Sequence, residues 1–319
     1  MPLLAVENLR TYYHSSRGQT RAVDGVSFSV EAGQSLGIAG ESGCGKSTVA
    51  LSLIRLVKGG ETVGGSVTLD GISLMDMSIS DFNRTVRWQR ISLVPQGAMG
   101  ALDPVFRVGD QIVEAIMAHT KDKKSVAWER AEQLLRHVDI DPARARNYPH
   151  ELSGGMCQRV MIAMALALGP RLVIADEPTT ALDVVTQAQV LKLLRRLQRE
   201  MNIAIVFISH DLSTLAQACD RIMIMYAGKA MEIGGCEEIF RTPLHPYTRA
   251  LLDAFPDIRG TRKARSLGGR PPDLLAPPPG CRFHARCSEA IAVCSVDEPA
   301  MAEVSPGRRV ACHLSGPRS

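Results

Sequence analysis

The sequence has 319 residues, of which 45% are hydrophobic, 22% are charged and 4% are aromatic, and its formal net charge is +4. This composition is typical of a soluble globular protein, and the length suits one large α/β domain with an appendage or two modest domains. The longest apolar runs, such as 160–168 and 203–208, are much shorter than the roughly 18 residues of a transmembrane helix, which excludes a membrane-spanning protein.

The N-terminal part of the chain predicts three strands and a helix. Residues 3–9 and 22–30 alternate in the manner of β-strands. A turn at 31–33 leads to the apolar strand 35–39, and helical sequence follows a glycine-rich turn at 47–57. Because the chain starts on a strand-like segment, we expect no signal peptide.

The glycine-rich turn matches the phosphate-binding P-loop pattern GxxxxGK[ST], and it follows an apolar strand and begins a helix. The matching residues are Gly40, Glu41, Ser42, Gly43, Cys44, Gly45, Lys46 and Ser47. The glycines allow backbone N–H groups to surround phosphates, toward which the helix directs its positive end. Lys46 is expected to reach the β- and γ-phosphates and Ser47 to ligate Mg²⁺. We assign the loop and the following Thr48 to nucleotide binding.

Helices and strands alternate through the middle of the chain. Helical periodicity is present at 105–119, 125–138, 154–168 and 186–201, and short continuous apolar runs are present at 172–175 and 204–209. Such runs are typical of buried parallel strands. The alternation predicts a doubly wound α/β core with a mostly helical insertion near 100–165.

Titratable side chains follow two of these strands. Asp176 and Glu177 end the first, where one carboxylate is expected to serve Mg²⁺ and Glu177 to polarise the attacking water. His210 follows the second strand, at the edge where ligands bind in open α/β sheets. Together with the P-loop, these residues provide the metal site, the charge clamp and the positioned nucleophile that phosphoryl transfer needs.

Residues 152–159, with the sequence LSGGMCQR, resemble the signature motif of ABC ATPases. A serine, two glycines and a helix N-terminus make a second anion site here. The resemblance implies that Ser153 and Gly155, with Gly154 between them, close over the γ-phosphate held by the opposite subunit. It also implies an α/β fold: a P-loop NTPase core of the ABC ATPase type, with an N-terminal antiparallel β subdomain and a helical insertion subdomain.

The other positions of the ABC ATPase pattern are also present, and the resemblance gives each a role. They are Tyr13 for stacking on adenine, with Tyr12 as the alternative; Gln96 in the Q-loop; Asp176 and Glu177 as the Walker B aspartate and the catalytic glutamate; Asp183 in the D-loop; and His210 as the switch histidine. The resemblance therefore implies an ATPase with Glu177, His210 and Gln96 as catalytic residues. It implies that Ser47, Gln96 and Asp176 bind Mg²⁺.

The sequence changes character after about residue 256, where prolines interrupt regular structure. We expect a nucleotide-binding domain at 1–256 and an extension at 257–319. Residues 258–319 hold ten Lys or Arg against five Asp or Glu, but no aromatic stacking pattern. We therefore interpret the basic tail as a solvated linker and expect no nucleic-acid partner.

Two segments of the second half are similar to the oligopeptide/dipeptide importer ATPases. One is 241–248, which contains His-Pro-Tyr-Thr, and the other is the Cys-bearing sequence that starts at 280–287. The segment 97–104, GAMGALDP, departs from the family, which often has an acidic residue and a Ser-Leu-Asn-Pro run there. This departure leaves the cargo open.

Four cysteines near the C-terminus form the pattern C-x₅-C-x₆-C-x₁₇-C. They are Cys281, Cys287, Cys294 and Cys312. Four thiolates are a ligand set for zinc or for an iron–sulfur cluster, although the spacing matches neither the usual zinc pairs nor the ferredoxin runs. Some relatives of this type carry a [4Fe–4S] cluster on the corresponding cysteines, so the resemblance favours a cluster. Free thiols, zinc and disulfides are the alternatives.

The importer resemblance implies partners and a location for an enzyme that uses ATP and Mg²⁺. We expect a second ABC ATPase subunit, identical or different, two transmembrane permease subunits and, indirectly, an extracytoplasmic solute-binding protein. We expect the chain to be a peripheral protein at the cytoplasmic face of the inner membrane. Peptides are the usual cargo, nickel and glutathione are alternatives, and a soluble ABC ATPase outside transport is the rival class.

Overall fold

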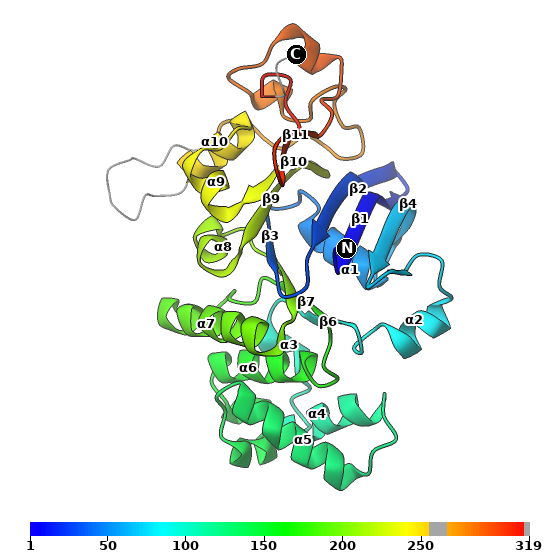
Figure 1. Cartoon of the computed structure of the whole chain (residues 1–319), viewed down its shortest axis with the longest axis vertical. Coiled ribbons are helices and arrows are strands. Elements are labelled where there is room, and N and C mark those ends of the chain that lie inside the picture. Colours follow the sequence, from blue (N-terminus) through cyan, green and yellow to red (C-terminus); the bar gives the residue numbers. More distant parts are fainter. Residues whose placement is uncertain (255–266, 316–319) are drawn as a thin grey trace. The chain divides into compact units, whose positions relative to one another are not determined.

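The computed structural model describes residues 1–254 and 267–315, which form two compact units (Figure 1). The first, which we call the helical unit, comprises residues 31–35 and 76–208 together with Met1. The second, which we call the P-loop unit, comprises the remaining described residues. Within the described residues, no helix combines the length and the apolar character that crossing a bilayer requires.

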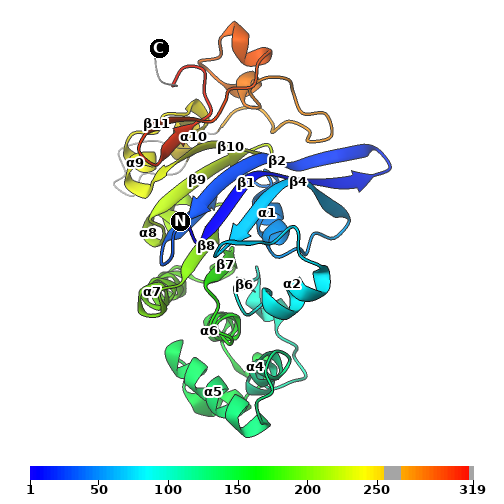
Figure 2. The same ribbon diagram turned by 45° about the vertical axis from the view of Figure 1, so that its right-hand side comes forward.

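The P-loop unit begins with an antiparallel sheet in the order β2-β1-β4-β5. Its strands are β1 (Leu4–Ser15), β2 (Gly18–Val30), β4 (Gly60–Leu69) and β5 (Ile72–Ser73). Leu4 pairs with Val30 on one side and with Leu69 on the other, and all three side chains are fully buried. Helix α1 (Lys46–Leu53) lies against this sheet (Figure 2).

A second group of strands in the P-loop unit has the order β11-β12-β10-β9-β3. They are β3 (Ser35–Ala39), β9 (Arg221–Tyr226), β10 (Lys229–Gly235), β11 (Ala302–Ser305) and β12 (Arg308–Val310). β3 is parallel to β9, and the C-terminal strands extend the group because β12 pairs with β10. The helices of this unit besides α1 are α8 (Leu212–Ala218), α9 (Cys236–Arg241) and α10 (Pro246–Asp253), with 3₁₀ turns at His284–Arg286 and Ala292–Ser295.

The helical unit contains three parallel strands and a set of helices. The strands are β6 (Ile91–Val94), β7 (Leu172–Asp176) and β8 (Ala204–Ile208). The helices are α2 (Ile79–Thr85), α3 (Ala98–Ala101), α4 (Val108–Met117), α5 (Lys124–His137), α6 (Gly154–Ala165) and α7 (Val184–Met201), with 3₁₀ turns at Pro142–Arg146 and Pro149–Glu151. Helices α4, α5 and α6 pack on one another (Figure 2). α5 buries Ala127, Ala131, Leu134 and Leu135, a spacing that gives one apolar face.

The structure confirms the predicted fold class, with parallel strands, an N-terminal antiparallel sheet and a helical segment. The helix expected at 47–57 is shorter, because α1 ends at Leu53. Arg55 adopts a left-handed conformation with φ of 54°, which an α-helix does not continue through.

The interpretation of the basic tail as a solvated linker is wrong for part of it. Three arginines of the C-terminal segment, by which we mean residues 267–315, are almost fully buried against carboxylates of the preceding strands and loops. The pairs are Arg282 with Asp24, Arg286 with Glu41 and Arg308 with Glu232. Burying an unpaired guanidinium is costly, so each arginine requires its carboxylate. Residues 255–266, which contain other basic residues of the tail, lie outside the described residues.

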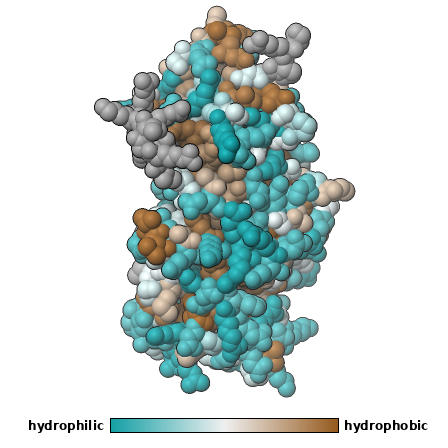
Figure 3. Space-filling model, turned by 60° about the vertical axis from the view of Figure 1, so that its left-hand side comes forward, coloured by the Kyte–Doolittle hydropathy of each residue, from teal (hydrophilic) through white to brown (hydrophobic). Residues whose placement is uncertain are grey.

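One face of the surface is largely hydrophilic, with apolar residues in small separate groups (Figure 3). Apart from Met1, the four most exposed large apolar side chains described in the helical unit are two neighbouring pairs. Val105 and Phe106 precede α4 and are 71% and 55% exposed, and Val184 and Val185 begin α7 and are 80% and 67% exposed. Single exposed apolar residues are ordinary on a protein surface, whereas contiguous exposed apolar patches mark interaction sites.

Candidate functional site

The P-loop residues form a tight turn between β3 and α1 that only glycine fits at two positions. Gly40 and Gly45 have φ of 153° and 106°. A Cβ atom at either residue would lie 2.1 Å from a backbone oxygen, that of Met225 at Gly40 and that of Ala22 at Gly45. The loop therefore passes close to two strands and leads directly into the N-terminus of α1, where an anion is favoured.

Lys46 is the first residue of α1 and is only 6% exposed. Its ammonium donates hydrogen bonds to the carbonyl oxygens of Gly40, at 2.8 Å, and Glu41, at 3.0 Å. The charge is therefore held inside the loop by the loop's own backbone. Ser47 is exposed beside it. This arrangement suits a phosphate chain that enters the loop from solvent.

The two adjacent tyrosines of β1 have different surroundings. The hydroxyl of Tyr13 lies 3.3 Å from Thr48 Oγ1 on α1, which places this ring next to the P-loop helix. The hydroxyl of Tyr12 donates instead to Asp24, at 2.7 Å. Burial raises the pKa of Asp24, but this hydrogen bond and nearby cations lower it more, so the pKa lies below its ordinary value. Tyr12 is thus part of the hydrogen-bonded ion-pair network around Asp24.

The carboxylate of Glu177 is held by two side chains of the helical unit. Gln96 Nε2 and Thr180 Oγ1 each donate to Glu177 Oε2 at 2.9 Å. The backbone is fixed as well, because Glu177 has a left-handed φ of 48° and its N–H donates to Ile208 O at 2.8 Å. Such a conformation costs about 1–3 kcal/mol, which the contacts around Glu177 must offset.

The structure thus brings Gln96 and Glu177 together, and it adds Thr180, which the sequence reasoning missed. The only sequence feature that could have indicated this contact was the position of Thr180, three residues after Glu177. Asp176 is the last residue of β7 and is half-buried, directly before Glu177. Mg²⁺ prefers carboxylate, amide and hydroxyl oxygens as ligands, so Asp176 and Gln96 have suitable chemistry for it.

The signature segment and Asp183 lie at the starts of two neighbouring helices. Ser153 caps α6 by accepting from the N–H of Met156, at 3.3 Å, and Asp183 caps α7 by accepting from the N–H of Thr186, at 3.0 Å. A Cβ atom at Gly155 would lie 2.5 Å from the methyl group of Thr186. Thr186 therefore lies next to the start of α6, through Gly155, and also bonds to the Asp183 cap of α7. Hydrogen bonds from Thr186 lower the pKa of Asp183, which is exposed like Ser153.

His210 is exposed and lies between β8 and α8. The next residue, Asp211, caps α8 by accepting from Ser213 N–H at 2.8 Å and from the hydroxyl of Thr214 at 2.7 Å. This cap fixes the turn on which His210 stands. His210, Tyr13 and the P-loop belong to the P-loop unit, whereas Gln96, Asp176, Glu177, the signature and Asp183 belong to the helical unit.

The four C-terminal cysteines line one small cavity of the P-loop unit. Burial, with a smaller contribution from the other three cysteines, raises the pKa of the Cys281 thiol to about 11. None of the four forms a disulfide. Among residues 1–254 and 267–315, no group of three or more His, Cys, Asp and Glu side chains is arranged to hold a metal ion. The four cysteines therefore lie around one cavity, while the described residues give no support for a metal there.

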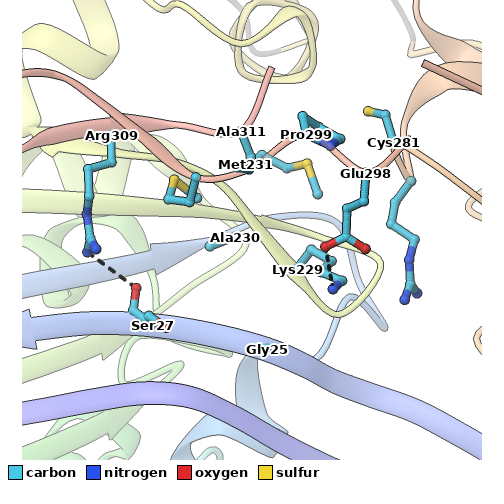
Figure 4. Close-up of a pocket in the computed structure, with 13 residues that line it drawn as sticks. Gly25, Ser27, Lys229, Ala230, Met231, Cys281, Glu298, Pro299, Arg309 and Ala311 are labelled. Carbon is cyan, nitrogen blue, oxygen red and sulfur yellow. Dashed lines mark hydrogen bonds and ion pairs between the residues drawn. The ribbon is translucent and has the colours of Figure 1, made fainter. Parts of the chain in front are cut away.

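Residues of β2, of β10 and of the C-terminal segment line a larger cavity, of about 290 Å³ (Figure 4). Lys229 of β10 forms an ion pair with Glu298 across it, at 2.7 Å, and Arg309 donates to the backbone oxygen of Ser27, at 3.3 Å. None of the P-loop residues lines this cavity.

Two family profiles match the chain. The profile described as "ABC transporter" matches residues 23–180, and the profile described as "Oligopeptide/dipeptide transporter, C-terminal region" matches 231–294. The probable peptide ABC transporter ATP-binding protein y4tR of Sinorhizobium fredii is 47% identical over 98% of this chain and 95% of its own length. The oligopeptide transport ATP-binding protein OppD of Escherichia coli is 44% identical over 97% of this chain and 92% of its own.

Solved structures give the same result for the fold. A dimeric structure of MJ0796, a bacterial ABC transporter cassette, has a TM-score of 0.66 and 26% identity, and it covers 73% of this chain and 98% of that one. The structure of cbiO1 from Clostridium perfringens, part of the ABC transporter complex cbiONQ, has a TM-score of 0.66 and 27% identity, with coverage of 76% and 91%.

Proposed function

The chain belongs to the ATP-binding subunits of ABC transporters, and we propose that it hydrolyses ATP to energise the import of dipeptides or oligopeptides. The hydrogen bond from Gln96 to Glu177 carries the proposal for hydrolysis, because it fixes a carboxylate at the end of a buried strand. The 42–47% identity to peptide transporter ATP-binding proteins supports the cargo.

The residues divide the work of phosphoryl transfer as follows. The P-loop amides and Lys46 bind the β- and γ-phosphates, and Tyr13 stacks on the adenine. Ser47, Gln96 and Asp176 hold Mg²⁺, which neutralises phosphate charge when it is bound. Glu177 accepts a proton from the attacking water, and His210 donates a hydrogen bond to the γ-phosphate. Thr180 keeps the Glu177 carboxylate in place.

We propose that the active form is a dimer in which Ser153, Gly155 and Asp183 complete the site of the opposite ATPase subunit. The exposure of both capped helix starts supports this role. Val184 and Val185 follow Asp183 and are exposed apolar residues, so a partner that covers them gains hydrophobic free energy. The partner is a second copy or a related chain. The dimeric structure of the MJ0796 cassette supports a dimeric form.

The proposal also assigns membrane partners. Two permease subunits bind the helical segment near 100–165 at the cytoplasmic face of the inner membrane, and a solute-binding protein delivers the peptide to them. The exposed pair Val105 and Phe106 supports this docking surface. We place the nucleotide-binding domain at 1–256 and the extension at 257–319.

Reconstitution tests the proposed function. The chain is co-expressed with its partner ATPase and permeases and placed in proteoliposomes with a solute-binding protein. We expect ATP hydrolysis to be stimulated by a peptide-loaded binding protein. Stimulation by nickel or glutathione instead would replace the peptide assignment. Hydrolysis that neither the permeases nor a loaded binding protein alters would favour a soluble ABC ATPase.

Replacement of Phe106 by Ser is expected to uncouple transport from hydrolysis. The side chain is 55% exposed, so its loss leaves the fold intact but removes an apolar anchor from the permease surface. Peptide uptake into proteoliposomes should fall about tenfold, while ATP hydrolysis by the detergent-solubilised ATPase dimer stays within about twofold. Val63→Ser is the matched control, since Val63 is an exposed apolar residue of β4. Equal uptake by both variants would refute the docking surface.

We further propose that the four C-terminal cysteines bind a [4Fe–4S] cluster. The proposal rests on their number and on the one cavity that they line, because four thiolates are the ligand set that such a cluster requires. Within the described residues these cysteines are not arranged to hold a metal ion, so binding requires them to move closer together. Anaerobically purified protein should be coloured and contain about four iron atoms per chain. Cys287→Ser should lower the iron content, whereas Cys236→Ser, outside the cavity, should not. A colourless, iron-free and fully folded protein would leave reduced thiols or zinc, which metal analysis separates.

A further inference from the structure

Glu41, the second residue of the P-loop, is held by two residues that are more than 200 positions away in the sequence. Its N–H donates to the hydroxyl of Tyr247, at 3.0 Å. Its carboxylate accepts from both terminal nitrogens of Arg286, at 2.7 and 2.9 Å. Arg286 lies in the C-terminal segment, directly before Cys287. The P-loop is therefore attached to a part of the chain that has no place in the catalytic scheme above.

The geometry of the Arg286 side chain is fixed on every side. Its Nε donates to Gly268 O at 2.8 Å, and Nη1 also donates to the hydroxyl of Tyr226 at 3.0 Å. The guanidinium carbon lies 5.5 Å from the centre of the Tyr226 ring. The hydrogen bonds to Glu41 raise the pKa of Arg286 above its ordinary value. A planar guanidinium held in this way presents both donors to the carboxylate. The Arg286 side chain therefore loses little conformational entropy when it bonds to Glu41.

The ion pair is shielded from water, which distinguishes it from ordinary surface pairs. The side chain of Arg286 is 7% exposed and that of Glu41 is 22% exposed. Exposed pairs contribute little to stability or binding, whereas bidentate pairs in a protected setting form strong, well-oriented hydrogen bonds. The contact is therefore able to hold the Glu41 backbone against the motion that a glycine-rich loop otherwise has.

The second support of Glu41 comes from an aromatic cluster. The ring of Tyr247 lies 4.6 Å from that of Tyr226 and 5.2 Å from that of Phe283 between centroids. Tyr247 is fully buried, so its hydroxyl has a fixed position. Glu41 also contacts Lys46, the lysine assigned to the nucleotide phosphates. The backbone carbonyl of Glu41 accepts a hydrogen bond from the Lys46 ammonium, at 3.0 Å. A continuous set of contacts thus joins Arg286, Glu41 and Lys46.

We propose that Arg286 and Tyr247 are positioning residues for the P-loop, and that the C-terminal segment thereby sets the affinity of this chain for ATP. The physical reason is preorganisation. A loop already held in its binding conformation loses less entropy when phosphates bind, so its dissociation constant is smaller. The residues act on binding, because their contacts with Glu41 hold the loop that receives the phosphates.

The test is the affinity of the full-length chain for Mg–ADP by titration calorimetry, together with ATPase kinetics. For Arg286→Gln we expect the dissociation constant and the KM for ATP to rise about tenfold, with kcat changed by less than about twofold. Arg286→Lys keeps the charge but loses the bidentate geometry, so its values should lie between those of wild type and Arg286→Gln. Tyr247→Phe should give a smaller rise of the same kind.

A double-mutant cycle distinguishes positioning from a general structural effect. Glu41→Gln should weaken Mg–ADP binding by the same factor as Arg286→Gln, and the double variant should be no weaker than either single one. Arg249→Gln is the matched control, because it breaks the ion pair of Arg249 with Glu289 without reaching the P-loop. It should leave the dissociation constant unchanged.

Two results would overturn the proposal. One is an unchanged dissociation constant in a folded Arg286→Gln variant, and the other is simple additivity of the Arg286 and Glu41 effects. If Arg286→Gln does not fold, the same criteria apply to Arg286→Lys and Tyr247→Phe. Wild-type hydrolysis with unaltered KM in these variants would remove the positioning role and leave the ATPase assignment intact.

Discussion

Replacement of Glu177 by Gln is expected to slow ATP hydrolysis by about 10²–10³-fold while nucleotide binding is retained. The amide has nearly the same size and keeps an oxygen that accepts from Gln96 and Thr180, which both donate to Glu177 Oε2 at 2.9 Å. It is neutral, however, and is unable to take a proton from water. The variant should therefore bind ATP and accumulate as the closed dimer, which phosphate-release assays and size-exclusion chromatography with ATP will measure.

Two further variants define what the Glu177 result means. Thr180→Val removes one hydrogen bond to the carboxylate but leaves the base, so hydrolysis should fall only about tenfold. Glu200→Gln removes an exposed carboxylate of α7 that pairs with Arg196 at 3.9 Å, and it should have no effect. Hydrolysis at the wild-type rate by Glu177→Gln would show that another group activates the water.

Replacement of Arg308 by Leu is expected to destabilise the protein by about 3–5 kcal/mol. Arg308 pairs with Glu232 at 3.0 Å, and the carboxylate of Glu232 is completely buried, where it also accepts from the backbone N–H groups of Leu244 and His245. Removing the guanidinium leaves a buried charge without its counter-ion. Urea unfolding of the full-length chain at neutral pH will measure the change in the free energy of unfolding.

The exposed pair of Arg241 and Glu237 provides the control for this prediction. Both side chains are about three-quarters exposed, at 77% and 74%, so Arg241→Leu should change the free energy of unfolding by less than about 0.5 kcal/mol. The double variant Arg308→Leu with Glu232→Met replaces both charges by apolar groups and should recover part of the lost stability. Equal unfolding midpoints for Arg308→Leu and Arg241→Leu would contradict the prediction.

The candidate site was predictable wherever its chemistry is local in the sequence. The P-loop glycines, Glu177 at the end of β7 and Ser153 at the start of α6 each lie on a short strand–loop or loop–helix unit whose pattern is visible within about ten residues. The hydrogen bond between Gln96 and Glu177 was not readable from the residues, because it joins positions 81 apart in the sequence. Only the family resemblance assigned these residues to one site.

The basic tail illustrates what local patterns miss. Its excess of arginines is typical of a solvated segment. In the structure, Arg282 is buried against Asp24 and Arg286 against Glu41, at sequence separations of 258 and 245. The charge of the partner and the burial of the pair depend on which strands the tail covers. Composition therefore indicated the wrong environment for these side chains.

By itself, the amino-acid sequence determined the fold class and the chemistry of nucleotide binding, because hydrophobic periodicity and the P-loop act over a few neighbouring residues. Tertiary structure decided how those parts are supported. Thr180 on Glu177, Thr186 beside Gly155, and Arg286 with Tyr247 on Glu41 are contacts whose geometry forms only when distant segments pack. Directional hydrogen bonds and buried ion pairs require partners within a few ångströms, and the folded chain alone brings these partners together.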